Sequence, residues 1–299
     1  YAGDTGGNIW RVDMSGGSPM SSTEPWTAFK LAELGGTTNL SDRRFFSEPS
    51  IVRTIISDTI ETSTVDVNGV TTTVVTRQGR PYDAILIGSG DRSTPLDTDT
   101  EDRFFMVRDE NIVTKSFTGS SSAPIPAAIK ITELYDFSNN PFGQTLTPQQ
   151  RIALEIAVTN KSGWFIKLSG SGEKSTATAI AIEGVAYFTS FQPAAGSANT
   201  CEIDPVSGFL YAVNLALGTT VYLWNDQKIL TTTGTIETPQ LIITQDGTGT
   251  GTGTGGTPCT GTNCPHVDVT NPTIKILAGK VIIPLGITID TWRTYLYAT

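Results

Sequence analysis

The stretch YAGDTGGNIWRVDM, residues 1–14, predicts a β-hairpin and points to an all-β fold. Tyr1-Ala2 and Ile9–Val12 are two short strand-like runs. Gly3–Asn8 separates them and is rich in Gly and Asn, which take positive φ at little cost. We expect Asp4 and Asn8 to cap backbone groups in this turn. A phosphate cradle is the other reading of a glycine-rich loop, but no lysine and no helix follow, so the turn is favoured.

The same pattern recurs along the chain. An apolar strand leads to a turn of Gly, Asp or Asn, and an aromatic strand follows, as in AILIGSGDR…RFFMVRDE (84–110) and GFLYAVNLALGTTVYLW (208–224). Asn68-Gly69 marks the tip of a hairpin over Val65–Val75. Further strands are expected at Pro49–Ile56, Tyr82–Gly88, Arg103–Asp109, Gly163–Leu168, Gly184–Ser190, Gly208–Asn214, Val221–Trp224, Gln240–Thr244, Ile274–Leu277 and Gly279–Pro284. Such cycles predict a β-propeller, and the long aromatic-rich cycles disfavour the alternative, a large β-sandwich.

One short helix is expected among these strands. Thr147 is a suitable N-cap, Pro148 suits the first helical position, and Gln150 completes a capping box, so a helix is predicted from Pro148 to about Thr159. Its core-facing side chains are expected to be Ile152, Leu154 and Ile156. We place this helix in a connection between two blades.

Composition excludes several classes of protein. The 299 residues carry a formal net charge of −9, from 29 acidic and 20 basic residues, which argues against a nucleic-acid surface. No apolar run approaches the ~18–20 residues of a membrane span. His266 is the single histidine, so chemistry that needs several histidines is excluded. We predict one domain over residues 1–299.

The three cysteines lie late in the chain. Cys259 and Cys264 flank a short Gly-Thr loop, which favours a disulfide between them over a zinc site that would also use His266. A disulfide implies an oxidising compartment. Cys201 is expected to stay free or to pair outside this chain. The Gly/Thr-rich segment 246–266 cannot build a core and is expected to be a flexible loop within the domain.

Several segments, taken in order, resemble the PilY-type tip-associated adhesins of bacterial type IV pili. The segments are YAGDTGGNIWRVDM (1–14), LIGSGDRSTPLDTDTEDRFFMVRDE (86–110), SGWFIKLSGSGEK (162–174), GVAYFTSFQP (184–193), Cys201 with GFLYAVN (208–214), and the tail ending DTWRTYLYAT. Gaps in the resemblance fall at Thr59–Thr76 and in the Gly-Thr loop.

The resemblance implies a modified, quinoprotein-like β-propeller. It implies roles in pilus assembly, retraction control and surface attachment at the cell surface or pilus tip, with minor pilins or a tip complex as partners. It also implies a calcium loop and a host-binding or surface-binding region upstream of residue 1, so the chain would be the C-terminal part of a longer protein. No cofactor is then expected within residues 1–299.

The candidate site residues are few. Asp97, Asp99 and Glu101 take relative positions 1, 3 and 5, as in a calcium loop, but the Gly at position 6 and the acid at position 12 are absent, so a solvated acidic loop is favoured. Asp91, Arg92 and Asp109 are expected to form ion pairs between blades, with a partner-binding surface as the alternative. The tryptophans expected to pack between blades are Trp10, Trp164, Trp224 and Trp292.

Two function classes follow from these segments. The first is a non-enzymatic pilus-associated adhesin or assembly factor. The second is a quinoprotein-like dehydrogenase, which would need a quinone cofactor and often a vicinal cysteine pair; no adjacent cysteines occur here. A structural subunit of an extracellular filament is a third reading. We favour the first, because the order of the segments matches the pilus family and a shared fold does not establish catalysis.

Overall fold

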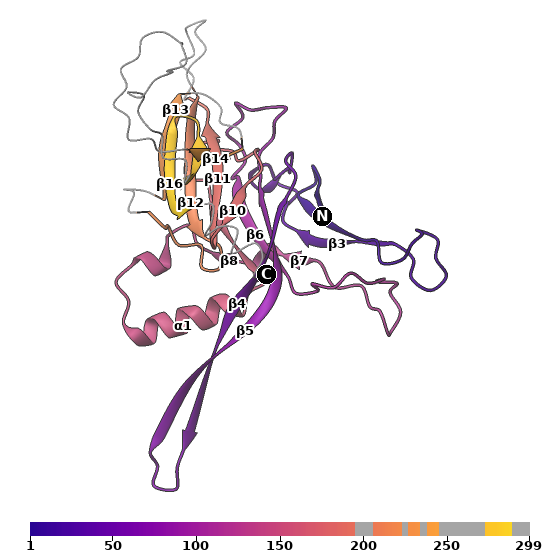
Figure 1. Ribbon diagram of the computed structural model, residues 1–299, viewed down its shortest axis with the longest axis vertical. Coiled ribbons are helices and arrows are strands. Elements are labelled where there is room, and N and C mark those ends of the chain that lie inside the picture. The colour runs from indigo at the N-terminus through magenta and orange to yellow at the C-terminus, as the bar shows by residue number, and fades with distance from the viewer. Residues whose placement is uncertain (195–205, 223–226, 234–237, 245–272, 289–299) are drawn as a thin grey trace, which may run out of the picture. The chain divides into compact units, whose positions relative to one another are not determined.

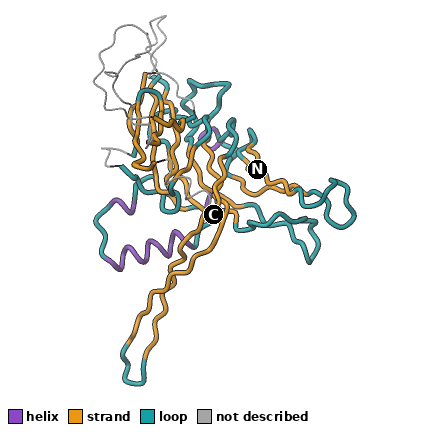
Figure 2. The backbone as a smooth tube through the Cα atoms, in the orientation of Figure 1, coloured by secondary structure: helices purple, strands orange, loops and turns teal. Residues whose placement is uncertain are grey.

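The computed structural model describes residues 1–194, 206–222, 227–233, 238–244 and 273–288, which are mainly β-sheet (Figures 1 and 2). The chain divides into two compact units, Tyr1–Thr238 and Pro239–Thr299. The predicted all-β class with one inserted helix is confirmed, since α1 is the single α-helix among the described residues. The single domain and the closed propeller remain predictions.

Three sheets make up the first unit. The first sheet has the order β1 (Ala2–Gly3), β2 (Asn8–Asp13), β3 (Thr27–Glu33) and β7 (Ile129–Lys130). The central sheet has the order β4 (Ser50–Val65), β5 (Thr71–Gly88), β6 (Arg103–Asp109), β9 (Gly163–Lys167) and β8 (Tyr135–Asp136). The third sheet has the order β10 (Ile180–Ile182), β11 (Val185–Gln192), β12 (Ser207–Asn214) and β13 (Lys228–Thr233). The 3-10 turns are Asn39–Ser41, Ile131–Glu133 and Pro141–Gly143.

The second unit holds a separate antiparallel sheet. Its strands are β14 (Gln240–Thr244), β15 (Thr273–Ala278) and β16 (Val281–Thr288), with β15 in the middle. Ile276 is fully buried and faces Leu241 and Ile283 on the two neighbouring strands. The first two of these predicted strands are therefore confirmed to within one residue at their ends, and the third begins two residues later and ends four residues later than predicted.

The opening hairpin forms as predicted. β1 pairs antiparallel with β2, and Gly7 closes the turn with φ of 74°. The Asp4 carboxylate accepts hydrogen bonds from the backbone N–H groups of Gly6 and Asn8, both at 2.9 Å, and from the Trp10 indole at 2.7 Å. The turn is thus built by a capping aspartate. Trp10 is 37% exposed, so its expected role in packing between sheets is wrong.

The helix α1 spans Pro148–Thr159, as its sequence predicts. The Thr147 hydroxyl accepts from the Gln150 amide, and the Gln150 side chain accepts from Thr147 N–H at 2.9 Å, which completes the capping box. Val158 is fully buried and Leu154 packs on the same core. Ile152 and Ile156 are only half-buried, so the core-facing stripe lies closer to the C-terminal end than expected.

The central sheet is covered on both faces, and this explains its continuous apolar runs. On β5, Ile85 and Ile87 belong to the core shared with the first sheet, whereas Ala84 and Leu86 belong to the core shared with the third sheet. The strand side chains alternate between faces, so an apolar residue is needed at nearly every position. β6 and β9 alternate in the same way, and Trp164 is fully buried in the second of these cores, as predicted.

Aromatic side chains join the central and third sheets. The Phe104 ring on β6 stacks on the Phe188 ring of β11 with centroids 3.6 Å apart, and Phe188 stacks on Tyr211 of β12 at 4.5 Å. The Trp164 indole donates to the Leu215 carbonyl at 2.9 Å, which satisfies its buried polar atom. The three sheets of the first unit therefore pack in chain order, with the central sheet in the middle.

The β4–β5 hairpin extends far beyond the sheets (Figure 1). Its distal segment Glu61–Val75, which we call the arm, is exposed at every residue except half-buried Val75. At the tip, Gly69 takes φ of 79° and the Asp66 carboxylate accepts from the N–H groups of Asn68 and Val70. The turn therefore spans Asp66–Val70 and is wider than a two-residue Asn-Gly loop by Asp66 and Val67 on one side and Val70 on the other.

Some predictions differ from the structure, and others concern residues that it does not describe. The strands β3, β7, β8 and β13 were not predicted, because they are brief or carry charged residues. Val221 and Tyr222 form a bend and not the start of a strand. The calls that lie outside the described residues are the 246–266 loop, Cys201, Cys259, Cys264, His266, Trp224 and Trp292.

Candidate functional site

The acidic loop proposed as a calcium site is an exposed turn. The Asp97 carboxylate accepts from the backbone N–H of Asp99 at 3.0 Å, and the Asp97 carbonyl accepts from the Lys174 ammonium. Both aspartate side chains are exposed to solvent. The Asp97 carboxylate is therefore used for a local turn bond.

Glu101, the third candidate ligand, faces three cations. It pairs with Arg103, and its oxygens lie 3.5 Å from both Arg43 and Lys167. Burial raises the Glu101 pKa, but the bond and charge of Arg103 and the charges of Lys167 and Arg43 lower it further, so the net shift is downward. This crowd of positive charge opposes a divalent cation. No three acidic, His or Cys side chains in the described segments gather as a metal site.

The predicted ion pair between sheets is present at Asp109. Arg11 on β2 donates to Asp109 on β6 at 2.7 Å and to both oxygens of Asp13 at 2.6 and 2.7 Å, and all three side chains are buried. Tyr1 also donates to Asp109 at 3.1 Å, and burial followed by the Asp109 charge raises the Tyr1 pKa. This network fixes the first sheet on the central sheet, which is a structural role.

A second buried polar cluster lies at the end of the central sheet. Asp102 is buried and accepts from the Ser89 hydroxyl at 2.7 Å, while its other oxygen has no partner among the described residues. Burial raises the Asp102 pKa to about 6, although the Ser89 bond and the charges of Lys174 and Arg43 oppose the shift. Lys174 is also buried and donates to backbone carbonyls only, so burial lowers its pKa.

Beside this cluster lies a cavity of about 740 Å³, which we call the polar cavity. Lys228 lines it and pairs with buried Glu173, which also accepts from the Tyr211 hydroxyl at 2.9 Å and from the Gly170 N–H at 2.7 Å. The other charged lining residues, Glu101 and Lys167, are paired with each other. The charges of the polar cavity are therefore already neutralised within the wall.

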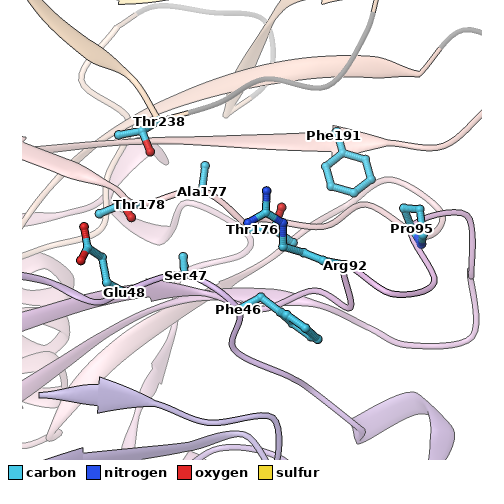
Figure 3. A pocket seen from close by; sticks show the side chains of 10 residues that line it. All are labelled: Phe46, Ser47, Glu48, Arg92, Pro95, Thr176, Ala177, Thr178, Phe191 and Thr238. Carbon is cyan, nitrogen blue, oxygen red and sulfur yellow. The ribbon is translucent and has the colours of Figure 1, made fainter.

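A second cavity of about 610 Å³, which we call the groove, opens where loops of the central and third sheets meet (Figure 3). Its lining residues are Phe46, Ser47, Glu48, Arg92, Pro95, Thr176, Ala177, Thr178, Phe191 and Thr238. Figure 3 shows the Arg92 side chain extending between Phe46 on one wall and Thr176 on the other. The predicted ion pair of Arg92 between blades is wrong, because Arg92 makes no ion pair with a described residue and lines the groove.

Arg92 and Glu48 carry the unpaired charges of the groove. Neither side chain makes an ion pair or hydrogen bond with any residue in the described part of the chain. Asp91, the neighbour of Arg92, instead pairs with Arg44 at 3.0 Å and accepts from the Ser93 N–H at 2.7 Å. The two cavities therefore differ. The charged residues of the polar cavity pair within the protein, whereas those of the groove can pair with a ligand.

Local backbone bonds position the groove. Gly90 donates to the Arg44 carbonyl at 3.0 Å, which holds the loop that carries Arg92 against the segment that carries Phe46. Ser175 donates to the Ser89 carbonyl at 2.9 Å, while Lys174 and Phe191 exchange two backbone bonds. The groove residues come from five separate segments, so no local motif in the sequence could have grouped them.

Comparisons of the chain with protein-family models, with curated proteins and with solved structures found no match. These comparisons therefore show no family for this chain. Among the described residues no helix could cross a bilayer, since α1 has 12 residues and a span needs ~20.

Proposed function

We propose that this chain is a non-enzymatic scaffold of the PilY type, which acts in type IV pilus assembly, retraction control and attachment outside the cell. The first, central and third sheets would be consecutive blades of a modified propeller. Minor pilins or the pilus tip complex would be its partners, and host or surface ligands would bind through a further region.

The order of the resembling segments carries this proposal. Residues 1–14 form β1 and β2, residues 86–110 include the end of β5 and all of β6, and residues 184–193 and 208–214 supply most of β11 and β12. Each of these four segments supplies strands to one of the stacked sheets, in chain order. The gap in the resemblance, Thr59–Thr76, covers the arm, where an insertion changes no packing between sheets.

Deleting the gene in the source bacterium tests the proposal. We expect fewer surface pili by electron microscopy, restored by the intact gene, and gold-labelled antibody to the chain at pilus tips. Normal pilus number, together with no label on pili, would contradict the proposed function.

A variant without the arm tests whether pilins contact the sheets or the arm. Replacing Glu61–Val75 by Asn-Gly leaves Ile60 opposite Thr76 and keeps the bonds from Thr59 and Arg77 to Glu155 on α1. If pilins contact the sheets, this variant restores pilus number as well as the intact gene does. If it fails to restore pili while it reaches normal levels, the contact lies on the arm, and the sheets are not the pilin-binding surface.

A further inference from the structure

The groove in Figure 3 is lined by charged, aromatic and hydroxyl side chains that could contact a ligand. Arg92 is exposed and presents five N–H donors in a planar fork, which match a carboxylate. No acidic residue in the described part of the chain takes them, and the protein as a whole carries a net charge of −9. An unpaired arginine in a cavity of an acidic protein is therefore a local site for an anionic group.

The walls beside Arg92 are apolar and aromatic. The Phe46 ring is 37% exposed, and Phe191 and Pro95 lie at the same end of the groove (Figure 3). An exposed ring on a cavity wall offers a flat apolar surface against which the apolar face of a ligand ring loses water. A bare inorganic anion would make no use of this wall.

The remaining walls carry hydroxyl groups and one carboxylate. Ser47, Thr176 and Thr178 line the groove, and the Ser47 hydroxyl is buried without a partner among the described residues. Such an atom is costly unless a ligand or water bonds it. Glu48 is exposed, faces Thr178 in Figure 3, and can only accept hydrogen bonds when ionised. The ligand should therefore carry several hydroxyl donors at this end.

We propose that the groove binds a carboxylated sugar, such as a uronic or sialic acid residue of a glycan. The sugar carboxylate pairs with the Arg92 guanidinium, one face of the sugar ring packs on Phe46, and sugar hydroxyls bond Glu48, Ser47 and Thr178. A cavity of about 610 Å³ lies within the range of small-ligand sites. A purely acidic peptide fits less well, because Glu48 repels a second negative charge. This inference does not depend on the proposed pilus function.

Titration calorimetry with the whole chain tests the proposal. The probes are sialyllactose, glucuronic acid, neutral lactose and inorganic phosphate. We expect the two acidic sugars to bind with Kd of about 1 mM or tighter, and lactose and phosphate to bind at least tenfold more weakly. Equal binding of phosphate would show a plain anion site, equal binding of lactose would show no role for the carboxylate, and no binding of either acidic sugar to ~10 mM would also overturn the proposal.

Two variants locate the site, and one controls for charge. Arg92→Gln should weaken binding of the acidic sugars tenfold or more, and Phe46→Ala should weaken it severalfold. Arg151→Gln removes an equally exposed arginine on α1, outside the groove, and should leave binding unchanged. Unfolding curves of Arg92→Gln and Arg151→Gln should coincide with that of the wild-type chain, because both side chains are exposed. Unchanged binding in Arg92→Gln, or an equal loss in Arg151→Gln, would overturn the assignment.

Discussion

The two halves of β5 form one continuous strand with opposite environments. Tyr82–Gly88 is buried at every residue between two other sheets, whereas Thr71–Arg80 is exposed apart from half-buried Val75 and Arg80. Both halves pair with β4 in the same unbroken register. Pro81 lies at the junction, where β5 no longer pairs with β6 and a missing N–H costs no ladder bond.

The difference shows that strand pairing and stability are separate properties. A two-stranded ribbon without a covering layer is marginal in water, since backbone bonds made in solvent contribute little net free energy. The buried half gains from apolar surface removed from water on both faces. Stability should therefore respond strongly to changes in the stacked half and weakly to changes in the arm.

The largest expected effect comes from removing the central aromatic contact. Phe104→Ala takes away a fully buried ring stacked on Phe188 and leaves a cavity between two sheets, so it should lower the free energy of unfolding by about 3–5 kcal/mol. Val74→Ala on the arm, where the side chain is 54% exposed, should change it by less than ~0.5 kcal/mol. Urea unfolding of both variants measures the contrast. Equal losses of unfolding free energy in the two variants would contradict this contrast between the buried half and the arm.

Glycines of the two halves give a matched pair. A Cβ at Gly88 would lie 2.3 Å from Ser175 Oγ and 2.5 Å from its carbonyl oxygen, so Gly88→Ala must shift backbone and should cost about 2–3 kcal/mol. A Cβ at Gly79 meets only the exposed Ile55 side chain, at 3.0 Å, which can move. Gly79→Ala should fall within ~0.5 kcal/mol of wild type in the same urea measurement. A larger loss at Gly79 would show that the exposed half of β5 is coupled to the core.

The two regions should also respond to pH in opposite ways. In the folded chain Asp102 keeps its proton up to about pH 6, against an ordinary pKa of 3.8, so the folded state binds more protons between these values. Stability should therefore fall as pH rises from 4 to 6, by on the order of 2 kcal/mol, and Asp102→Asn should remove the fall.

Asp66 on the arm has a pKa shifted in the opposite direction and serves as the control for the pH experiment. Backbone N–H groups of Val70 and Asn68 lower the Asp66 pKa, so its contribution is lost only as pH falls below its usual range. Asp66→Asn should therefore leave the slope between pH 4 and 6 unchanged. A flat profile in the wild-type chain would show that Asp102 titrates normally. Thermal unfolding across this pH range measures both variants.

The smallest effect is expected from removing the arm. Replacing Glu61–Val75 by Asn-Gly removes exposed residues and no core contact, so the unfolding midpoint should stay within ~2 °C of wild type. Hydrogen exchange sharpens the same point: amides of the arm should exchange by local opening, and those of Tyr82–Gly88 only by global unfolding. Slow exchange in the arm would mean that something covers it.

Sequence alone determined the features that depend on neighbouring residues. The Thr147–Gln150 capping box fixed the N-terminal end of helix α1, and Asp4 with Gly7 fixed the first turn. These motifs work because each donor and its acceptor are only a few residues apart. The all-β class followed from apolar runs such as Tyr82–Gly88, whose length and β-branched content suit strands.

Tertiary structure decided what those runs pack against and which charges stay unpaired. In sequence, Asp91, Arg92 and Asp109 are three similar charged positions. In the structure, Asp91 pairs with Arg44, 47 residues away, and Asp109 pairs with Arg11, 98 residues away. Arg92 instead lines the groove. Electrostatic pairing depends on distance in space, which chain separation does not report. For the same reason Phe46, Thr176 and Phe191 share one cavity, although nothing in their local sequence joins them.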